Sequence, residues 1–330
     1  MWPLALLSLA LASAFPSHTH AAAQTADASV SPDLYSGLKW RSIGPFHGGR
    51  ISAVTGVIGQ PGTFYVGTPM GGVWRTTSAG VTWVPIVDQL TSIDSIGAVV
   101  VAPSNPDVIY VGSGDPIAGG DGDGMYKSTD GGKTWAHIGL EAAHRISKMV
   151  IDPKDPDLVV VAAVGDGNNG EAGGVYRTTD GGHTWQKVLT PQGATAVRDL
   201  GYDFSAPNLM FAVTMGAGGR GFGGAAAGRG AAAPEPAKLF KSTDEGKTWT
   251  EITTAPKYPG RISVAVAMHS NGQRLYLVGS PMDNGSGLYR SDDGGATWKH
   301  MAGTDTRVAN GQGNYQSGVF VDPKTPTSST

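Results

Sequence analysis

A ten-residue string occurs four times in the chain and constrains its fold more than any other feature. It reads YKSTDGGKTW at 126–135, YRTTDGGHTW at 176–185, FKSTDEGKTW at 240–249 and YRSDDGGATW at 289–298. A weaker fifth copy, RTTSAGVTW, ends at Trp83. The closing tryptophans follow one another at intervals of 52, 50, 64 and 49 residues. A period of this length predicts a protein built from similar units placed side by side.

A second marker keeps the same register. An apolar segment begins each unit, and a Pro or Gly follows its first residue eleven positions later. These pairs are Arg50 and Pro61, Ser95 and Pro106, Arg145 and Pro156, Ala196 and Pro207, Arg261 and Gly272, and Tyr315 and Pro326. The third unit reads as four strands: RISKMVI, DLVVVAAV, GGVYRTTD and HTWQKVL. Four short strands per unit, repeated along the chain, predict the antiparallel blades of an all-β propeller.

The two ends of the repeat predict an incomplete ring. LKWRSIG at 38–44 matches KTWAHIG at 133–139, which predicts a fourth strand without a blade of its own. NYQSGVFVDPKTPTSST at 314–330 supplies a first strand and no second. We therefore expect five full blades, an orphan outer strand and a sixth inner strand, with an open edge near 315–322. The remaining blades are expected in a longer parent chain, since propeller sheets close their edges.

The composition and charge of the chain exclude several classes of function. The chain has no cysteine, which excludes disulfides, zinc–thiolate sites and thiol nucleophiles. A net charge of −3 gives no electrostatic signature for nucleic acid or an anionic membrane. The run MWPLALLSLALASAF, followed by small residues up to Ala23, predicts a signal peptide over 1–23 and export to a bacterial envelope. We expect a linker at 24–35, the partial propeller over 36–330 and a low-complexity Gly/Ala insert at 215–237.

The repeated string is interpreted as a structural turn between the third and fourth strands. A short carboxylate there can accept backbone N–H groups of its own turn, glycine takes a positive φ, and tryptophan buries its ring. In the first copy Ser78 replaces the aspartate, which suits a structural role. The residues assigned to this turn are Ser78, Gly80 and Trp83; Ser128, Asp130, Gly132 and Trp135; Thr178, Asp180, Gly182 and Trp185; Ser242, Asp244, Gly246 and Trp249; and Ser291, Asp293, Gly295 and Trp298.

These S/T-x-D-x-G-x-T-W strings resemble the Asp-box (BNR-type) repeats of sialidase, xyloglucanase and sortilin-type propellers. PDVIYVGSG leading into GMYKSTDGGKTW is most similar to the exported sortilin-like, glycosyl hydrolase-like propellers of bacteria, as is the opening LKWRSIGPFHGGRISAV. The resemblance covers roughly residues 35–322. It implies that the Asp-box turns lie on the face opposite any active site. We call these the Asp-box face and the top face.

The top face would carry the loops between second and third strands, and these are rich in acidic residues. Paired carboxylates on facing loops could act as acid and base, or as nucleophile, on a sugar. Two of them, with loop carbonyls, could instead hold calcium, although the other ligands of a calcium loop are missing. Solvated turn residues are the competing interpretation. The catalytic candidates are Asp115, Asp121 and Asp123 in 113–124, and Asp166 and Glu171 in 165–174; Asp121 and Asp123 are also the calcium candidates.

Arginines recur where the inner strands begin. Arg50, Arg145 and Arg261 occupy one slot of the repeat, and guanidinium groups at a channel mouth would bind a carboxylate or sulfate. Repeat symmetry alone explains the recurrence equally well, and the F-R-I-P string of sialidases is absent. Asn169 and Asp283 are further ligand-binding candidates on neighbouring loops.

The resemblance supports binding more than catalysis. Xyloglucanases carry an aspartate in a T-D-V-G-G string, and here the matching TPMGG places Pro69 at that position. Sortilin-type relatives bind peptides through their propellers. We therefore expect a module that binds a polypeptide or a glycan with no cofactor. The alternative is a glycoside hydrolase, and a third possibility is an assembly factor for a membrane complex.

Overall fold

The computed structural model describes residues 49–90, 93, 95–117, 120–165, 172–191, 196–216, 236–258, 260–279, 287–301 and 318–322. These residues form β-strands and one short 3₁₀ helix, Glu141–Ala143. The predicted signal peptide, the linker and the orphan strand at 38–44 lie outside them. Within the described part, no helix is long and apolar enough to cross a membrane.

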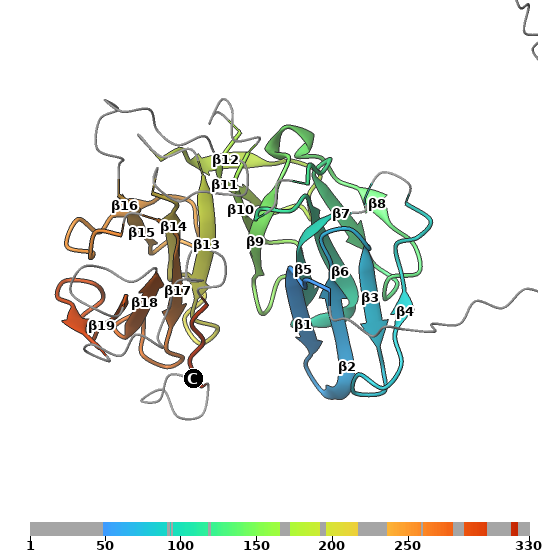
Figure 1. The fold of residues 1–330 in the computed structure, drawn as a ribbon, viewed down its shortest axis with the longest axis horizontal. Helices are drawn as coiled ribbons and strands as arrows, with labels where there is room; N and C mark the ends of the chain where they lie inside the picture. The colour runs from blue at the N-terminus through green and yellow to red at the C-terminus, as the bar shows by residue number, and fades with distance from the viewer. Residues whose placement is uncertain are drawn as a thin grey trace, which may run out of the picture. The chain divides into compact units, whose positions relative to one another are not determined.

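The strands form five antiparallel sheets of four, each sheet following the chain order, and we number these sheets as blades 1 to 5 (Figure 1). Blade 1 contains β1 (Ala53–Val57), β2 (Gln60–Gly67), β3 (Val73–Thr76) and β4 (Val84–Pro85). Blade 2 contains β5 (Ile96–Ala102), β6 (Asn105–Ser113), β7 (Met125–Ser128) and β8 (Ala136–His137). Blade 3 contains β9 (Ile146–Ile151), β10 (Val159–Ala163), β11 (Gly174–Thr178) and β12 (Gln186–Leu189).

The last two blades repeat the arrangement. Blade 4 contains β13 (Val197–Tyr202), β14 (Met210–Thr214), β15 (Leu239–Ser242) and β16 (Thr250–Glu251). Blade 5 contains β17 (Ile262–Val266), β18 (Leu275–Gly279), β19 (Leu288–Ser291) and β20 (Lys299–His300). The prediction of five four-stranded blades is thus confirmed.

The hydrophobic core lies between consecutive blades, which explains the continuous apolar runs of the inner strands. In β10, Val159 and Val161 pack in a cluster with residues of blade 2. Their neighbours Val160 and Ala162 point to the other side and pack with residues of blade 4. All four are fully buried. A strand covered on both faces must be apolar at every position, because successive side chains point to opposite sides of the sheet.

Inner strands touch in chain order, β1 with β5, β5 with β9, β9 with β13 and β13 with β17. Three of them carry a bulge at the same position. The register shifts at Gly97 in β5, at Ser147 in β9 and at Arg198 in β13. A bulge adds one residue to a strand and turns its side chain out of the regular alternation. These three positions therefore point differently from their neighbours.

Hydrogen bonds on the Asp-box face connect blade 1 to blade 2, blade 2 to blade 3 and blade 3 to blade 4. The basic residue before the Ser or Thr of the Asp-box makes the contact in each case. Arg75 donates to the carbonyl oxygen of Gly131 at 3.2 Å, Lys127 to Asp157 Oδ1 at 2.8 Å, and Arg177 Nε to the carbonyl oxygen of Glu245 at 2.9 Å. Each acceptor belongs to the following blade.

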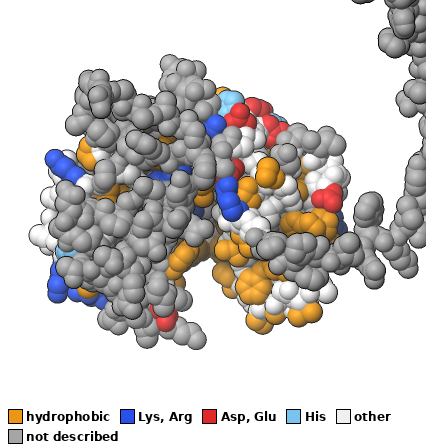
Figure 2. Space-filling model, viewed as in Figure 1, with side chains coloured by type: hydrophobic (Ala, Val, Ile, Leu, Met, Phe, Trp, Pro, Cys, Tyr) orange, Lys and Arg blue, Asp and Glu red, His pale blue; other side chains and the backbone are white. Residues whose placement is uncertain are grey.

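The first and last blades differ in how their outer faces are covered. Val319, from the predicted sixth inner strand, is buried against Ala265, Tyr276 and Val278 of blade 5. On blade 1, by contrast, Val54 is 67% exposed. Hydrophobic side chains gather on the surface over β1 and β2 (Figure 2).

Candidate functional site

The Asp-box turn is held together by its own side chains. Ser128 Oγ donates to Asp130 Oδ1 at 2.8 Å and accepts the N–H of Gly132 at 2.9 Å. Asp130 Oδ1 accepts the N–H of Thr134 at 2.9 Å, and Oδ2 accepts the Thr134 hydroxyl at 2.6 Å. The same bonds recur around Asp180, Asp244 and Asp293. Each carboxylate is therefore occupied by its own turn.

Blade 1 makes the same turn without a carboxylate. Ser78 Oγ accepts the N–H of Thr82 at 2.9 Å and lies 2.9 Å from its hydroxyl. Thr76 Oγ1 accepts the N–H of Gly80 at 3.0 Å, as Ser128 does for Gly132. A hydroxyl thus replaces the acid in closing this turn.

The Asp-box glycines and tryptophans complete the turn. Gly132, Gly182, Gly246 and Gly295 have φ angles of +86°, +95°, +79° and +95°, a conformation that side chains disfavour. The indole N–H groups of Trp83, Trp249 and Trp298 donate to the Gly of their own turn. Those of Trp135 and Trp185 donate instead to Ile86 and Ile138 of the preceding blade, at 2.9 and 2.7 Å. Two tryptophans thus also connect blades.

The hydrogen bonds keep the Asp-box carboxylates ionised. The Thr134 hydroxyl and N–H, followed by Ser128, hold the pKa of Asp130 well below its usual range. The corresponding bonds from Thr297 and Ser291 lower the pKa of Asp293 to about 2. A group that is already ionised and hydrogen-bonded cannot serve as a general acid near neutral pH.

These lowered pKa values predict acid sensitivity. Because the unfolded pKa of Asp is about 3.9, each carboxylate contributes stability that is present above about pH 5 and lost as the pH falls toward 2. Asp130→Ser, which installs the blade 1 residue, is expected to lose less stability on acidification than the original protein. Urea unfolding at several pH values measures this. Superimposable acid profiles for the two proteins would contradict the assignment.

On the top face, Arg50 and Asp115 form an ion pair between blades 1 and 2. Their closest atoms, Arg50 Nη2 and Asp115 Oδ2, lie 2.5 Å apart. The Asp115 side chain is 2% exposed, whereas that of Arg50 is 45% exposed. Asp115 Oδ1 also accepts the N–H of Ile117 at 2.8 Å. Asp115 is thus buried and fixed, and Arg50 presents its guanidinium to solvent.

Arg198 reaches the same region from blade 4 and was not among the residues singled out in the sequence. Its guanidinium donates to the carbonyl oxygen of Pro116, next to Asp115. Burial and the positive charge of Arg261 lower the pKa of Arg198 to about 9, while Asp199 and Asp115 oppose the shift. Arg261 itself is 4% exposed. Arg50 of blade 1 and Arg198 of blade 4 therefore lie beside Asp115, and Arg261 of blade 5 lies close enough to Arg198 to repel its charge.

The sequence contained a signal for Arg198. Other blades have small residues at this position of the inner strand, namely Ser52, Gly97, Ser147 and Ser263. A long basic residue in a slot otherwise filled by Ser or Gly must extend into the space between blades. The bulge at Arg198 directs it there.

The other acidic candidates have separate partners. Asp121 accepts from Arg145 Nη2 at 2.9 Å and Nε at 3.2 Å. Asp123 accepts the Tyr126 hydroxyl at 2.6 Å. Among the residues described, no group of three or more His, Cys, Asp or Glu side chains is placed to hold a metal ion. The candidates Asp166, Asn169, Glu171 and Asp283 lie outside the described residues.

Between the inner strands, Asp199 of blade 4 connects blades 3, 4 and 5. Its Oδ2 accepts the Ser263 hydroxyl of blade 5 at 2.5 Å, and its Oδ1 lies 3.8 Å from Lys148 Nζ of blade 3. These residues help line an otherwise largely apolar space of about 460 Å³ between the inner strands.

Comparisons with known proteins agree with this geometry. The sortilin family model (Sortilin, neurotensin receptor 3) matches residues 71–214, and the BNR/Asp-box repeat model matches residues 289–300. The chain is a β-propeller with BNR-type Asp-box repeats, and its residues 71–214 are similar to the sortilin family. No curated protein matched this propeller.

Two solved structures share the propeller fold. An ancestral GH74 enzyme is 21% identical, with a TM-score of 0.62 over 87% of this chain and 35% of its own. The GH74 xyloglucanase from Xanthomonas campestris is 18% identical, with a TM-score of 0.52 over 88% of this chain and 52% of its own. The propeller described here therefore spans about a third to a half of these relatives.

Proposed function

We propose that this propeller is an exported binding module whose top face takes a polypeptide or a glycan through an acidic group. The observation that carries the proposal is the top-face group of three guanidinium groups, those of Arg50, Arg198 and Arg261. Arg50, Arg198 and Arg261 outnumber the two carboxylates that interact with Arg50 or Arg198, those of Asp115 and Asp199, so this part of the top face keeps an excess of positive charge. Arg50 is exposed enough to meet a ligand directly, and the other two strengthen the local potential.

The partners of the acidic residues favour binding over catalysis. A glycoside hydrolase needs one carboxyl group to protonate the leaving oxygen and another to attack or activate water. Asp115, Asp121 and Asp123 are instead engaged by Arg50, Arg145 and Tyr126. Pro69, between β2 and β3, stands where the resemblance places a xyloglucanase aspartate. Export rests on the apolar run at 1–23, and no cofactor or nucleic acid is part of the proposal.

Arrays of peptides and of neutral, carboxylated and sulfated glycans test the proposal. We expect the bound probes to carry carboxylate or sulfate groups. Arg50→Glu should weaken their binding at least about tenfold, equivalent to about 1.4 kcal/mol. Lys133→Glu makes the same charge change on the Asp-box face and should leave binding unchanged.

Two results would contradict the proposal. One is binding that Arg50→Glu and Lys133→Glu affect equally. The other is hydrolysis of a polysaccharide by the protein, which would establish the glycoside hydrolase alternative. Because Arg50 holds Asp115, the melting temperature of each variant must be measured alongside.

A further inference from the structure

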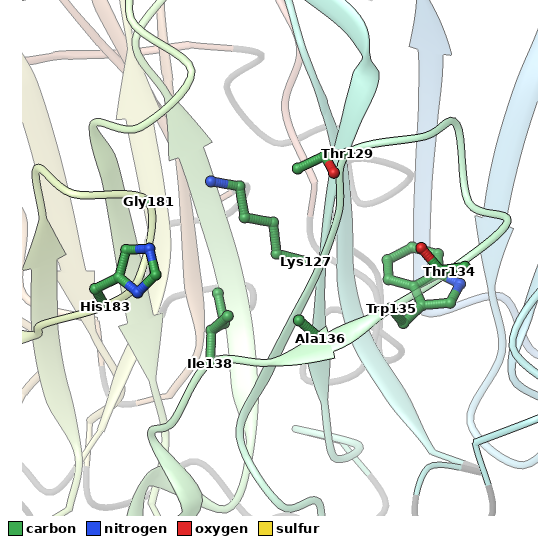
Figure 3. A pocket seen from close by; sticks show the side chains of 8 residues that line it. All are labelled: Lys127, Thr129, Thr134, Trp135, Ala136, Ile138, Gly181 and His183. Carbon is green, nitrogen blue, oxygen red and sulfur yellow. The ribbon is translucent and has the colours of Figure 1, made fainter.

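A cleft of about 290 Å³ opens between blades 2 and 3 near the Asp-box turns, away from the top-face arginines. Figure 3 shows its lining, with the Lys127 side chain extending from blade 2 toward the segment that carries Gly181 and His183. Blade 2 contributes Lys127, Thr129, Thr134, Trp135, Ala136 and Ile138, and blade 3 contributes Gly181 and His183. Two complete blades therefore form the cleft.

The lining combines apolar and hydrogen-bonding groups. Ala136 and Ile138 offer apolar surface, while the hydroxyls of Thr129 and Thr134 and the imidazole of His183 can hydrogen-bond. Thr134 already donates its hydroxyl proton to Asp130, so toward a ligand this oxygen acts as an acceptor. Lys127 supplies donors only. Donors and acceptors thus surround an apolar patch.

The charge in the cleft is already balanced. Lys127 Nζ donates to Asp157 Oδ1 at 2.8 Å and lies 5.3 Å from the centre of the Tyr110 ring. With its positive charge paired, Lys127 does not require an anion. A neutral ligand with many hydroxyl groups suits these surroundings better than a phosphate or a carboxylate does.

Glycine at position 181 keeps the cleft open. A Cβ atom there would lie 2.3 Å from Lys127 Nζ and 2.5 Å from Asp157 Oδ1. At the same position of blade 4 stands Glu245, whose carboxylate lies 3.6 Å from Arg177 of blade 3. In blade 5 this position is Gly294. A smaller cleft of about 140 Å³ is lined by the blade 4 residues Lys241, Thr243, Thr248, Thr250 and Ile252. In blade 5 the residue equivalent to His183 is Ala296.

We propose that the cleft between blades 2 and 3 is a binding subsite for one or two neutral sugar rings. A pyranose presents C–H groups on its faces and hydroxyls around its edge, which matches Ala136 and Ile138 inside a hydrogen-bonding rim. Its volume is at the lower end of ligand pockets, which suits a ligand smaller than a drug molecule. The subsite is independent of the proposed top-face function, because none of Arg50, Arg198 and Arg261 lines the cleft.

Cellobiose, xylobiose and maltose are suitable probes, titrated against the full chain by saturation-transfer NMR and calorimetry. We expect at least one to bind with a millimolar Kd, as shallow sites do. Gly181→Glu should weaken binding at least about tenfold, and His183→Ala about threefold or more. Gly294→Glu, the same change in the Asp-box turn of blade 5, should leave the binding of the sugar unchanged.

Either of two outcomes overturns the subsite. No binding of any of the three sugars at about 20 mM excludes it, since the Kd would then exceed the millimolar range. If a folded Gly181→Glu protein binds the sugar as tightly as the original protein does, the sugar binds at another site. That variant is expected to fold, because Glu245 already adopts a φ of +61° at the same position of blade 4. His183→Ala removes only an exposed ring and provides a second, milder test of the same contact.

Discussion

Asp115→Asn is expected to lower the free energy of unfolding by about 3 kcal/mol, because it removes a buried carboxylate that pairs with Arg50 and offsets the buried charge of Arg198. Asparagine can still accept the N–H of Ile117, so the loss reports the charge and not the loop conformation. Without this carboxylate, less negative charge remains to offset the repulsion between Arg198 and Arg261. Chemical denaturation of the purified variant measures the effect.

A second substitution separates this cause from a general loss of packing. Arg198→Met removes one of the two buried charges and keeps a side chain of similar length. The double variant should be more stable than the sum of the single effects predicts, by about 1 kcal/mol or more. Additive effects would mean that Asp115 and Arg198 do not interact. The loss of stability in Asp115→Asn would then have a cause other than the charge of Arg198.

Gly97→Ala should also destabilise the protein by about 3 kcal/mol or more, because the added methyl group has no space. Its Cβ would lie 1.9 Å from the carbonyl oxygen of Ile146 and 2.5 Å from that of Gly114. Both are backbone atoms, so relief requires β5 and β9 to move apart. The melting temperature and the urea midpoint should both fall.

Gly49→Ala is the matched control. No atom lies within 4 Å of a Cβ built at Gly49, and the chain there is exposed. This variant should be as stable as the original protein or slightly more so, since alanine reduces the freedom of the unfolded chain. If both variants behave alike, blades 2 and 3 do not depend on close contact of their inner strands.

Local patterns made the blades predictable. Continuous apolar residues at Val159–Ala163 predicted a strand covered on both faces, and this strand packs against two neighbouring blades. The Ser, Asp, Gly and Thr of the Asp-box contact one another within five residues, so their spacing alone defines the turn. Such short-range features need no knowledge of distant segments.

Contacts between distant segments were not predictable in the same way. Asp121 and Asp123 are two residues apart, yet one pairs with Arg145 and the other with Tyr126. Trp135 and Trp249 occupy identical motif positions, but only Trp135 donates to the preceding blade. Arg198 bonds a carbonyl 82 residues away. The spatial arrangement of the blades determines each of these partners, and the sequence specifies only the residue types.

The hydrogen bonds donated by Arg75, Lys127 and Arg177 bear on how such a chain can gain blades during evolution. In each case the donor lies before one Asp-box and the acceptor lies in the following blade. Blades 2 and 3 therefore each carry both a donor for the following blade and an acceptor for the preceding one. Tandem duplication of a single unit produces a new junction whose polar groups are already matched, since contacts in repeat proteins run between nearest neighbours. Lengthening the array by whole units thus requires no simultaneous change on two surfaces.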